Sequence, residues 1–167
     1  AGNKLPVGQV GEIAIRGPQV MAGYWNRPDE TAKVMTPDGF FRSGDIGRFD
    51  EDGFLYLVDR AKDMIIRGGE NVYCAEVEAA LYEHPDVYEA AVFGVPHERL
   101  GEEVAAAIVP KPGRVIEAEA LRTFLAKHLA PFKIPTRIHF SVEQLPRNPA
   151  GKILKRQLRD ALMTGDD

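Results

Sequence analysis

The sequence predicts an α+β fold, in which helices lie on a short, mostly antiparallel sheet preceded by a β-rich segment. Up to about residue 60, apolar residues come in short alternating runs, and this part holds 9 of the 16 glycines. After that point, helical spacing alternates with continuous strand-like runs. The chain of 167 residues is 44% apolar and 28% charged, which is typical of a globular protein.

Residues 1–60 are expected to be the incomplete, β-rich end of a larger domain. Glu12–Arg16 alternates polar and apolar residues, and Phe54–Val58 is a second strand-like run. Asp50–Gly53, immediately before the second run, has the composition of a turn, so a hairpin is predicted here. These strands are too few and too short to close a barrel, and we therefore expect part of the sheet to lie outside this chain.

Residues 61–167 are expected to form a small α+β domain, with the change of pattern near Asp59–Asp63. One helix is predicted where Val77 and Leu81 share a face and Pro85 ends the pattern. Apolar, partly β-branched runs bounded by Pro or Gly predict buried strands. In order, the predicted elements are a helix over residues 75–84, strands over 89–95 and 104–109, a helix over about 117–129 and a helix starting near 153.

Charge and rare residue types argue against several functions. The net charge of −4 gives no overall basic field for nucleic acid or a membrane surface. Cys74 is the only cysteine, which excludes an internal disulfide and fits a reducing compartment. The four histidines lack zinc-ligand spacing, and no apolar run reaches the roughly 18 residues of a membrane span. We expect a cytoplasmic protein with no metal site within this chain, no membrane span and no nucleic-acid partner.

Lys152 is the first candidate for chemistry, because Pro146–Lys152 is a turn rich in Pro and Gly that leads into the last predicted helix. A lysine at a rigid, exposed tip can reach phosphate or carboxylate oxygens. The segment is not a P-loop, since no glycine stands five positions before Gly151 and Ile153 replaces the required Ser or Thr. An ordinary surface lysine is the alternative that spacing alone leaves open.

Three other places carry charged or flexible residues. Asp45 follows a predicted Ser-Gly turn beside a strand, where its carboxylate can accept hydrogen bonds from a ribose diol or can simply bond its own turn. Asp59–Asp63 holds four charges in five residues and serves either as a hinge or as a solvated link. Gly68 and Gly69 allow positive φ and close approach of a ligand, although a plain tight turn explains them equally well.

Taken in order, several segments resemble the C-terminal third of the AMP-forming adenylating enzymes. They are GEI at 11–13, AGYW at 22–25, FRSGD at 41–45, DRAKDMIIRGGENVYCAEVE at 59–78 and LPRNPAGKILKRQL at 145–158. That superfamily contains acyl- and aryl-CoA ligases, adenylation domains of peptide synthetases and beetle luciferases. The resemblance covers almost the whole chain.

The resemblance implies a reaction in two steps. A carboxylate attacks the α-phosphate of Mg-ATP to give an acyl-adenylate and pyrophosphate, and a thiol, usually that of CoA, then displaces AMP. Between the steps the small C-terminal domain, here residues 61–167, rotates against the large N-terminal domain of the same polypeptide. The expected cofactors are ATP or AMP, CoA and Mg²⁺; the phosphate loop and the magnesium ligands are expected upstream of residue 1.

The resemblance also implies roles for individual residues. Lys152 matches the catalytic lysine of adenylation, which binds between the carboxylate and the α-phosphate and offsets the charge of the transferring group. Asp45 matches the ligand of the ribose hydroxyls, and Arg60 a ligand of the ribose or phosphate. Lys62 falls on the hinge position.

Gly68 and Gly69 match the loop that lines the pantetheine channel after rotation. The run GGENVYCAEVE at 68–78 resembles medium- and long-chain acyl-CoA or arylacyl-CoA ligases. We therefore expect a part of an acid–CoA ligase of fatty acid metabolism or aromatic acid activation, inactive without the rest of the enzyme. The alternatives are an adenylation domain that loads a carrier-protein thiol and a non-catalytic module that binds CoA or AMP.

Overall fold

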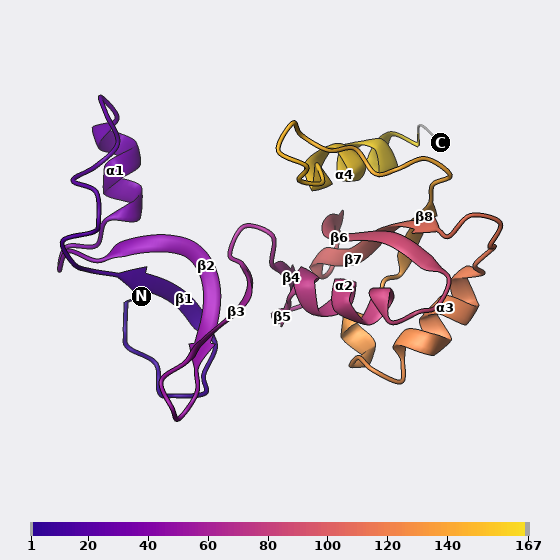
Figure 1. Ribbon diagram of the computed structural model, residues 1–167, viewed down its shortest axis with the longest axis horizontal. Coiled ribbons are helices and arrows are strands. Elements are labelled where there is room, and N and C mark those ends of the chain that lie inside the picture. The colour runs from indigo at the N-terminus through magenta and orange to yellow at the C-terminus, as the bar shows by residue number, and fades with distance from the viewer. Residues whose placement is uncertain (1, 166–167) are drawn as a thin grey trace. The chain divides into compact units, whose positions relative to one another are not determined.

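Residues 2–165 are described by a computed structural model, in which the chain divides after Lys62. The two compact parts, Ala1–Lys62 and Asp63–Asp167, are here called unit 1 and unit 2. Unit 1 has a three-stranded sheet and unit 2 a five-stranded sheet, and both contain helix (Figure 1). The α+β class predicted from the sequence is confirmed.

Unit 1 is built on an antiparallel sheet in the order β1 (Gly11–Ile15), β2 (Phe41–Phe49) and β3 (Leu55–Arg60). The predicted hairpin joins β2 to β3, and in its turn the amide of Phe54 donates to the Asp50 carboxylate at 2.8 Å. The helix α1 (Pro28–Val34) lies outside the predicted elements. It begins with a proline in its first turn, followed by two acidic residues, as helices often do.

The segment around Asp45 is a bulged strand and not the predicted turn. Residues 43–45 lie inside β2, and the register shifts against β1 and also against β3 along this part of the strand. Gly44 has φ +75°, a left-handed conformation that glycine adopts at little steric cost. Bulges of this kind bend a strand and redirect its side chains. The turn-like composition of FRSGD therefore reflects an irregular strand.

Unit 1 has little core of its own. Among its described residues Ile46 is the one buried apolar side chain, whereas the side chains of Trp25, Phe54 and Leu57 are 89%, 66% and 71% exposed. Exposed apolar surface of this extent usually packs against another element. On its own, unit 1 leaves most of its large apolar side chains in contact with water.

Unit 2 contains a mostly antiparallel sheet, as predicted. The two long strands β6 (Val87–His97) and β7 (Gly101–Pro110) include the predicted strands and pair along their whole length. β4 (Ile65–Arg67) and β5 (Glu70–Val72) extend the sheet beyond β7. The short strand β8 (Arg137–Phe140), which the sequence pattern did not indicate, pairs parallel to β7.

The helices of unit 2 follow the predicted order with shifted ends. The predicted helix over 117–129 is shorter, because the amides of Lys127 and His128 donate to carbonyls only three residues back and so tighten the chain into turns. Leu129 is nevertheless buried, as its place in the apolar pattern requires. The helical elements are α2 (Cys74–Tyr82), α3 (Ala118–Leu125), the 3₁₀ turn η1 (Pro131–Lys133) and α4 (Lys155–Thr164).

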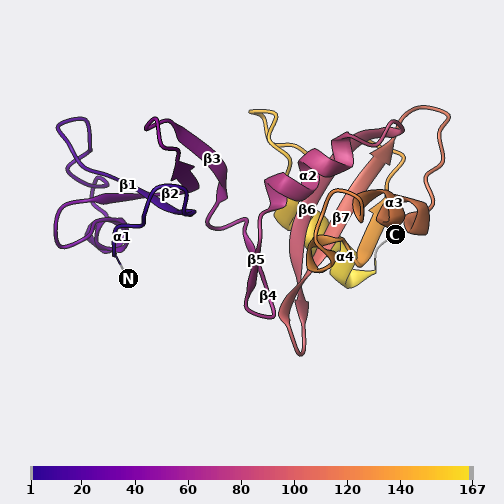
Figure 2. The same cartoon turned by 90° about the horizontal axis from the view of Figure 1, so that it is seen from below.

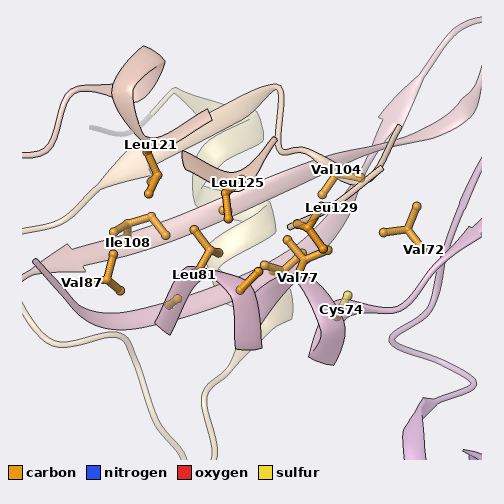
Figure 3. Packing of buried hydrophobic residues seen from close by; sticks show 14 of the residues in the cluster. Val72, Cys74, Val77, Leu81, Val87, Val104, Ile108, Leu121, Leu125 and Leu129 are labelled. Atoms are coloured by element: carbon orange, nitrogen blue, oxygen red, sulfur yellow. The ribbon is translucent and has the colours of Figure 1, made fainter. Parts of the chain in front are cut away.

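Alternate residues of β6 and β7 contribute to two apolar layers, because successive side chains of a strand point to opposite faces. In unit 2 the sheet lies between α4 on one side and α2 and α3 on the other (Figure 1), and Figure 2 shows α2 crossing in front of β6 and β7. The layer under α2 and α3 contains Val77, Leu81, Val104, Ile108, Leu121 and Leu125 (Figure 3). The layer under α4 contains Ala91, Phe93, Val95, Ala105, Ala107, Val109 and Leu145, with Ile153, Leu158 and Leu162 packed against them.

Candidate functional site

Lys152 lies at the tip of a closed hairpin that precedes α4. At the base, the amide of Leu154 donates to the carbonyl of Pro146 at 2.8 Å. At the tip, the amide of Asn148 donates to the carbonyl of Lys152 at 2.9 Å, and the amide of Lys152 donates to Oδ1 of Asn148 at 2.9 Å. The backbone of Lys152 is therefore held from both sides, while the residue is exposed.

The Lys152 ammonium has no hydrogen-bond or ion-pair partner among residues 2–165. Two other lysines of unit 2 are paired with carboxylates: Lys133 contacts Glu76 at 2.6 Å, and Lys155 contacts Glu78 at 2.7 Å. An exposed and unpaired ammonium is available to an anionic ligand. The structure thus has Lys152 on a rigid, exposed tip, and its catalytic role stays a prediction.

Asp45 and Arg60 lie together on neighbouring strands. They are register partners of β2 and β3, and Nε of Arg60 donates to Oδ1 of Asp45 at 3.3 Å. The Ser43 hydroxyl accepts from the Asp45 amide at 3.1 Å and donates to the Ile13 carbonyl at 2.8 Å, which fixes the backbone at the bulge. The Asp45 side chain is 37% exposed, so a ligand can reach the carboxylate.

Lys62 lies between one residue tied to unit 1 and one tied to unit 2. The amide of Ala61 donates to the carbonyl of Gly44 at 2.8 Å. The carbonyl of Asp63 accepts from the buried Cys74 thiol at 2.8 Å. Lys62 itself is exposed, and within residues 2–165 it makes no backbone hydrogen bond. Within the described residues, no backbone hydrogen bond of its own therefore restrains the φ and ψ of Lys62.

Gly68 and Gly69 form the two-residue turn between β4 and β5. Both have positive φ, +60° and +90°, which is the conformation of the tightest hairpin turns. The Gly68 amide donates to the Leu100 carbonyl at 2.8 Å, and a Cβ on Gly68 would lie 3.2 Å from the Leu100 side chain. Gly69 has open space around it. Backbone geometry alone accounts for both glycines, and their place in a pantetheine channel stays a prediction.

The candidates of unit 1 lie together, whereas those of unit 2 do not. Asp45 and Arg60 meet in unit 1. In unit 2, the golden loop that leads into α4 and the turn between β4 and β5 lie apart (Figure 2). The residues of unit 2 therefore offer two separate loops, one with a cation and one with an open glycine backbone.

Glu89 was not indicated by the sequence patterns, yet it anchors the Lys152 hairpin. This β6 residue is only 8% exposed. Its carboxylate accepts from the Leu145 amide at 2.9 Å and from the Arg147 guanidinium at 2.7 Å. The sequence does contain one indication of this role, because Glu89 stands in an apolar strand-like run, and a charged side chain is seldom buried without a partner.

The pKa of Glu89 lies below its ordinary value of 4.5. Burial alone raises the pKa of a carboxyl group, but the Leu145 amide and the Arg147 guanidinium together outweigh that effect. The folded state therefore binds the proton of Glu89 less readily than the unfolded chain does.

We expect Glu89→Gln to lower the free energy of unfolding of unit 2 by about 1–3 kcal/mol near neutral pH, because it removes a charged acceptor from two donors. Since the pKa is lower in the folded state, the carboxylate stabilises the fold above the unfolded-state pKa and loses this effect as the pH falls through the folded-state pKa. Urea unfolding of both proteins at a series of pH values measures the difference. A difference of constant size down to strongly acidic pH would contradict the assignment.

Two further properties concern the described residues. None of the helices within residues 2–165 is long and apolar enough to cross a bilayer. In the same part of the chain, no three acidic, histidine or cysteine side chains are grouped so that they could hold a metal ion.

Known proteins resemble this chain in sequence and in fold. Residues 76–152 match the AMP-binding enzyme C-terminal domain. The chain is 49% identical over 159 residues to the fatty acid–[acyl-carrier-protein] ligase ScoC of Streptomyces coeruleorubidus, covering 95% of this chain and 30% of that protein. It is 52% identical over 151 residues to a 2-succinylbenzoate–CoA ligase of Geobacillus kaustophilus, covering 90% and 30%.

A solved structure agrees with the sequence relatives. ATP-bound MatB from Rhodopseudomonas palustris superposes with a TM-score of 0.88 at 42% identity, over 96% of this chain and 32% of that chain. The matches define a C-terminal domain of AMP-binding enzymes. More particularly, the chain corresponds to the C-terminal part of enzymes of the AMP-forming adenylating superfamily. It spans about 30% of the length of the curated relatives that it matches.

Proposed function

We propose that the chain is the C-terminal part of an ATP-dependent, AMP-forming ligase that joins a fatty or aromatic acid to CoA in the cytoplasm. The observation that carries the proposal is the unpaired Lys152 ammonium on a hairpin with a fixed backbone. Named activities of the relatives support it, since they act on fatty acids and on 2-succinylbenzoate. In this proposal, residues 1–60 end the large N-terminal domain and residues 61–167 form the mobile domain.

In the first step, the acid carboxylate attacks the α-phosphate of ATP, and pyrophosphate leaves. Lys152 donates to oxygens of the carboxylate and the α-phosphate and so offsets the negative charge that gathers there. Asp45 accepts hydrogen bonds from the ribose hydroxyls. Arg60, which contacts only Oδ1 of Asp45, leaves Oδ2 available for that purpose and lies beside the ribose or phosphate.

In the second step, the CoA thiol attacks the acyl carbon, the acyl–phosphate bond breaks, and AMP leaves while the thiol proton passes to solvent. The Gly68–Gly69 turn supports this step, because the open space around Gly69 lets a narrow chain pass close to the backbone. Lys62 changes its dihedrals between the steps, so that unit 2 presents first its lysine hairpin and then its glycine turn.

A chimeric ligase tests the proposal. The C-terminal part of the 2-succinylbenzoate–CoA ligase of Geobacillus kaustophilus is replaced with this chain, which is 52% identical to it. We expect the chimera to release pyrophosphate from ATP with 2-succinylbenzoate and to form the CoA thioester, because the chain supplies the lysine of the first step and the turn of the second. Coupled pyrophosphate release and chromatography of the thioester measure the two products.

The same assay includes three controls. The ligase without its C-terminal part and this chain alone are each expected to form no acyl-adenylate, since each lacks part of the site. The chimera with Lys152→Ala is expected to lose pyrophosphate release. A folded chimera without activity, or pyrophosphate release by the isolated chain, would contradict the proposal.

A carrier-protein thiol is the second candidate acceptor, because ScoC is named as a ligase for an acyl-carrier protein and is 49% identical to this chain. In the complete ligase, competition between CoA and a phosphopantetheinylated carrier protein separates the two acceptors. A non-catalytic module that retains only nucleotide or CoA affinity is the third candidate. Calorimetric titration of the chain with AMP and with CoA, beside the chimera assay, distinguishes it from a ligase part.

A further inference from the structure

Glu89 is the one charged side chain that is buried among residues 2–165. It lies near the start of β6, beside the apolar layer that contains Leu145 and the residues of α4. Both carboxylate oxygens are used: Oε2 accepts from the Leu145 amide at 2.9 Å, and Oε1 accepts from Nη2 of Arg147 at 2.7 Å. The Glu89 carboxylate of β6 thus holds Leu145 and Arg147, which lie at the start of the Lys152 hairpin.

Arg147 continues the connection to the tip. Its other terminal nitrogen, Nη1, donates to the carbonyl of Gly151 at 2.7 Å. Gly151 directly precedes Lys152, and Arg147 also bridges to Ile153 across the hairpin. One planar guanidinium therefore joins a fixed carboxylate to the peptide group beside the candidate catalytic residue. Lysine does not reproduce this arrangement, since an ammonium lacks the rigid fork of donors.

We propose that Glu89 and Arg147 are positioning residues, which set where the Lys152 ammonium stands and so control the adenylation step. This inference rests on the proposed function. The contacts of Arg147 with Glu89 and with the Gly151 carbonyl are here called the clamp. Displacing a reactive group by about 1 Å can slow a reaction about a hundredfold, so the clamp affects the adenylation rate without contacting the substrate. The thioester step does not use Lys152 and is therefore independent of the clamp.

Arg147→Lys tests the clamp in the complete ligase, meaning the longer polypeptide of which this chain is proposed to be the C-terminal part. We expect kcat of adenylation to fall about 10- to 100-fold with little change in KM for acid and ATP, because binding is retained and geometry is lost. Thioester formation from supplied acyl-adenylate should be unchanged. Equal loss in both half-reactions would show a merely structural role and overturn the proposal.

Arg122→Lys is a matched control. Arg122 of α3 also holds a loop through its guanidinium, donating to the carbonyls of Pro135 at 3.1 Å and Thr136 at 2.7 Å. It lies on the side of the sheet away from the Lys152 hairpin, next to the other apolar layer. We expect this variant to leave both half-reactions unchanged. A loss of adenylation alone in this variant would mean that any lost loop contact has the same effect, which contradicts a specific clamp.

Amide hydrogen exchange on the 167-residue chain gives a readout that needs no activity. The amides of Gly151 and Lys152 are protected by Asn148 at 2.8 and 2.9 Å. We expect Arg147→Lys to speed exchange at these two amides about tenfold, with β6 and β7 unchanged. Glu89→Gln should speed exchange at the same two amides to a similar extent and, because it also lowers the free energy of unfolding, should speed exchange in β6 and β7 as well. Exchange that is unaltered in both variants would overturn the clamp, and having two variants covers the case in which one of them does not fold.

The two proposals fail in different ways. If Lys152→Ala leaves adenylation unchanged, the proposed function is wrong, whatever the exchange shows. If Lys152→Ala abolishes adenylation but Arg147→Lys changes neither adenylation nor exchange, the clamp is wrong and the function stands.

Discussion

Lys152→Ala in the complete ligase is expected to slow acyl-adenylate formation by about three orders of magnitude, the upper range for loss of one preorganised donor to a charged transition state. The ammonium is exposed, carries no internal partner among residues 2–165, and stands on a backbone held by Asn148. Nothing else in the hairpin replaces it, since Arg147 is already bonded to Glu89 and Gly151. Pyrophosphate release in single-turnover experiments measures the rate.

The second half-reaction is the control for this substitution. Supplied acyl-adenylate and CoA should give thioester at nearly the wild-type rate, because the lysine belongs to the first step only. Lys152→Arg tests geometry: it keeps the charge but replaces the compact ammonium with a planar group, so we expect it to recover little of the loss. Equal damage to both half-reactions would contradict the assignment of Lys152.

Lys62→Pro is expected to slow thioester formation more than adenylation. Proline fixes φ near −65° and also restricts the backbone of Ala61. The proposed hinge at position 62 then lacks the backbone freedom that the rotation of unit 2 between the two steps requires. A rise of only about 1.4 kcal/mol in the barrier slows that step about tenfold. No hydrogen bond is lost among residues 2–165, since the Lys62 amide has no backbone partner there. Rapid-quench measurement of both half-reactions gives the two rates.

Lys62→Ala separates charge from backbone freedom. It removes the ammonium and keeps φ and ψ free, so its effect on either half-reaction should be much smaller than that of proline. Equal slowing by alanine and proline would assign the effect to the side chain, and an unchanged thioester rate in Lys62→Pro would exclude position 62 as the hinge.

Most of the fold of unit 2 was predictable from local pattern. The apolar runs of β6 and β7 and the spacing of Val77 and Leu81 each carry a periodic signal that burial enforces. β8 was not predictable in this way, because four residues with one polar face become a strand only by pairing with β7. The turn predicted at 43–45 was wrong for a similar reason, since a bulge depends on both neighbouring strands.

Those features of the candidate site that lie within a single loop were predictable from the sequence, and contacts between distant segments were not. An exposed lysine after Pro and Gly is a local feature, and so is a pair of glycines in a tight turn. The contact of Glu89 with Arg147 spans 58 residues of sequence, and the pairing of Asp45 with Arg60 depends on the β2–β3 register. Such long-range contacts follow from packing and pairing, for which composition and spacing give no direct signal.

The unequal share of buried side chains has a thermodynamic consequence. Among the described residues, every buried apolar side chain except Ile46 belongs to unit 2. The heat capacity change and the denaturant dependence of unfolding both scale with the surface that unfolding exposes. A calorimetric or urea transition recorded on this chain therefore reports almost entirely on residues after Lys62, and the segment before it contributes little cooperative signal.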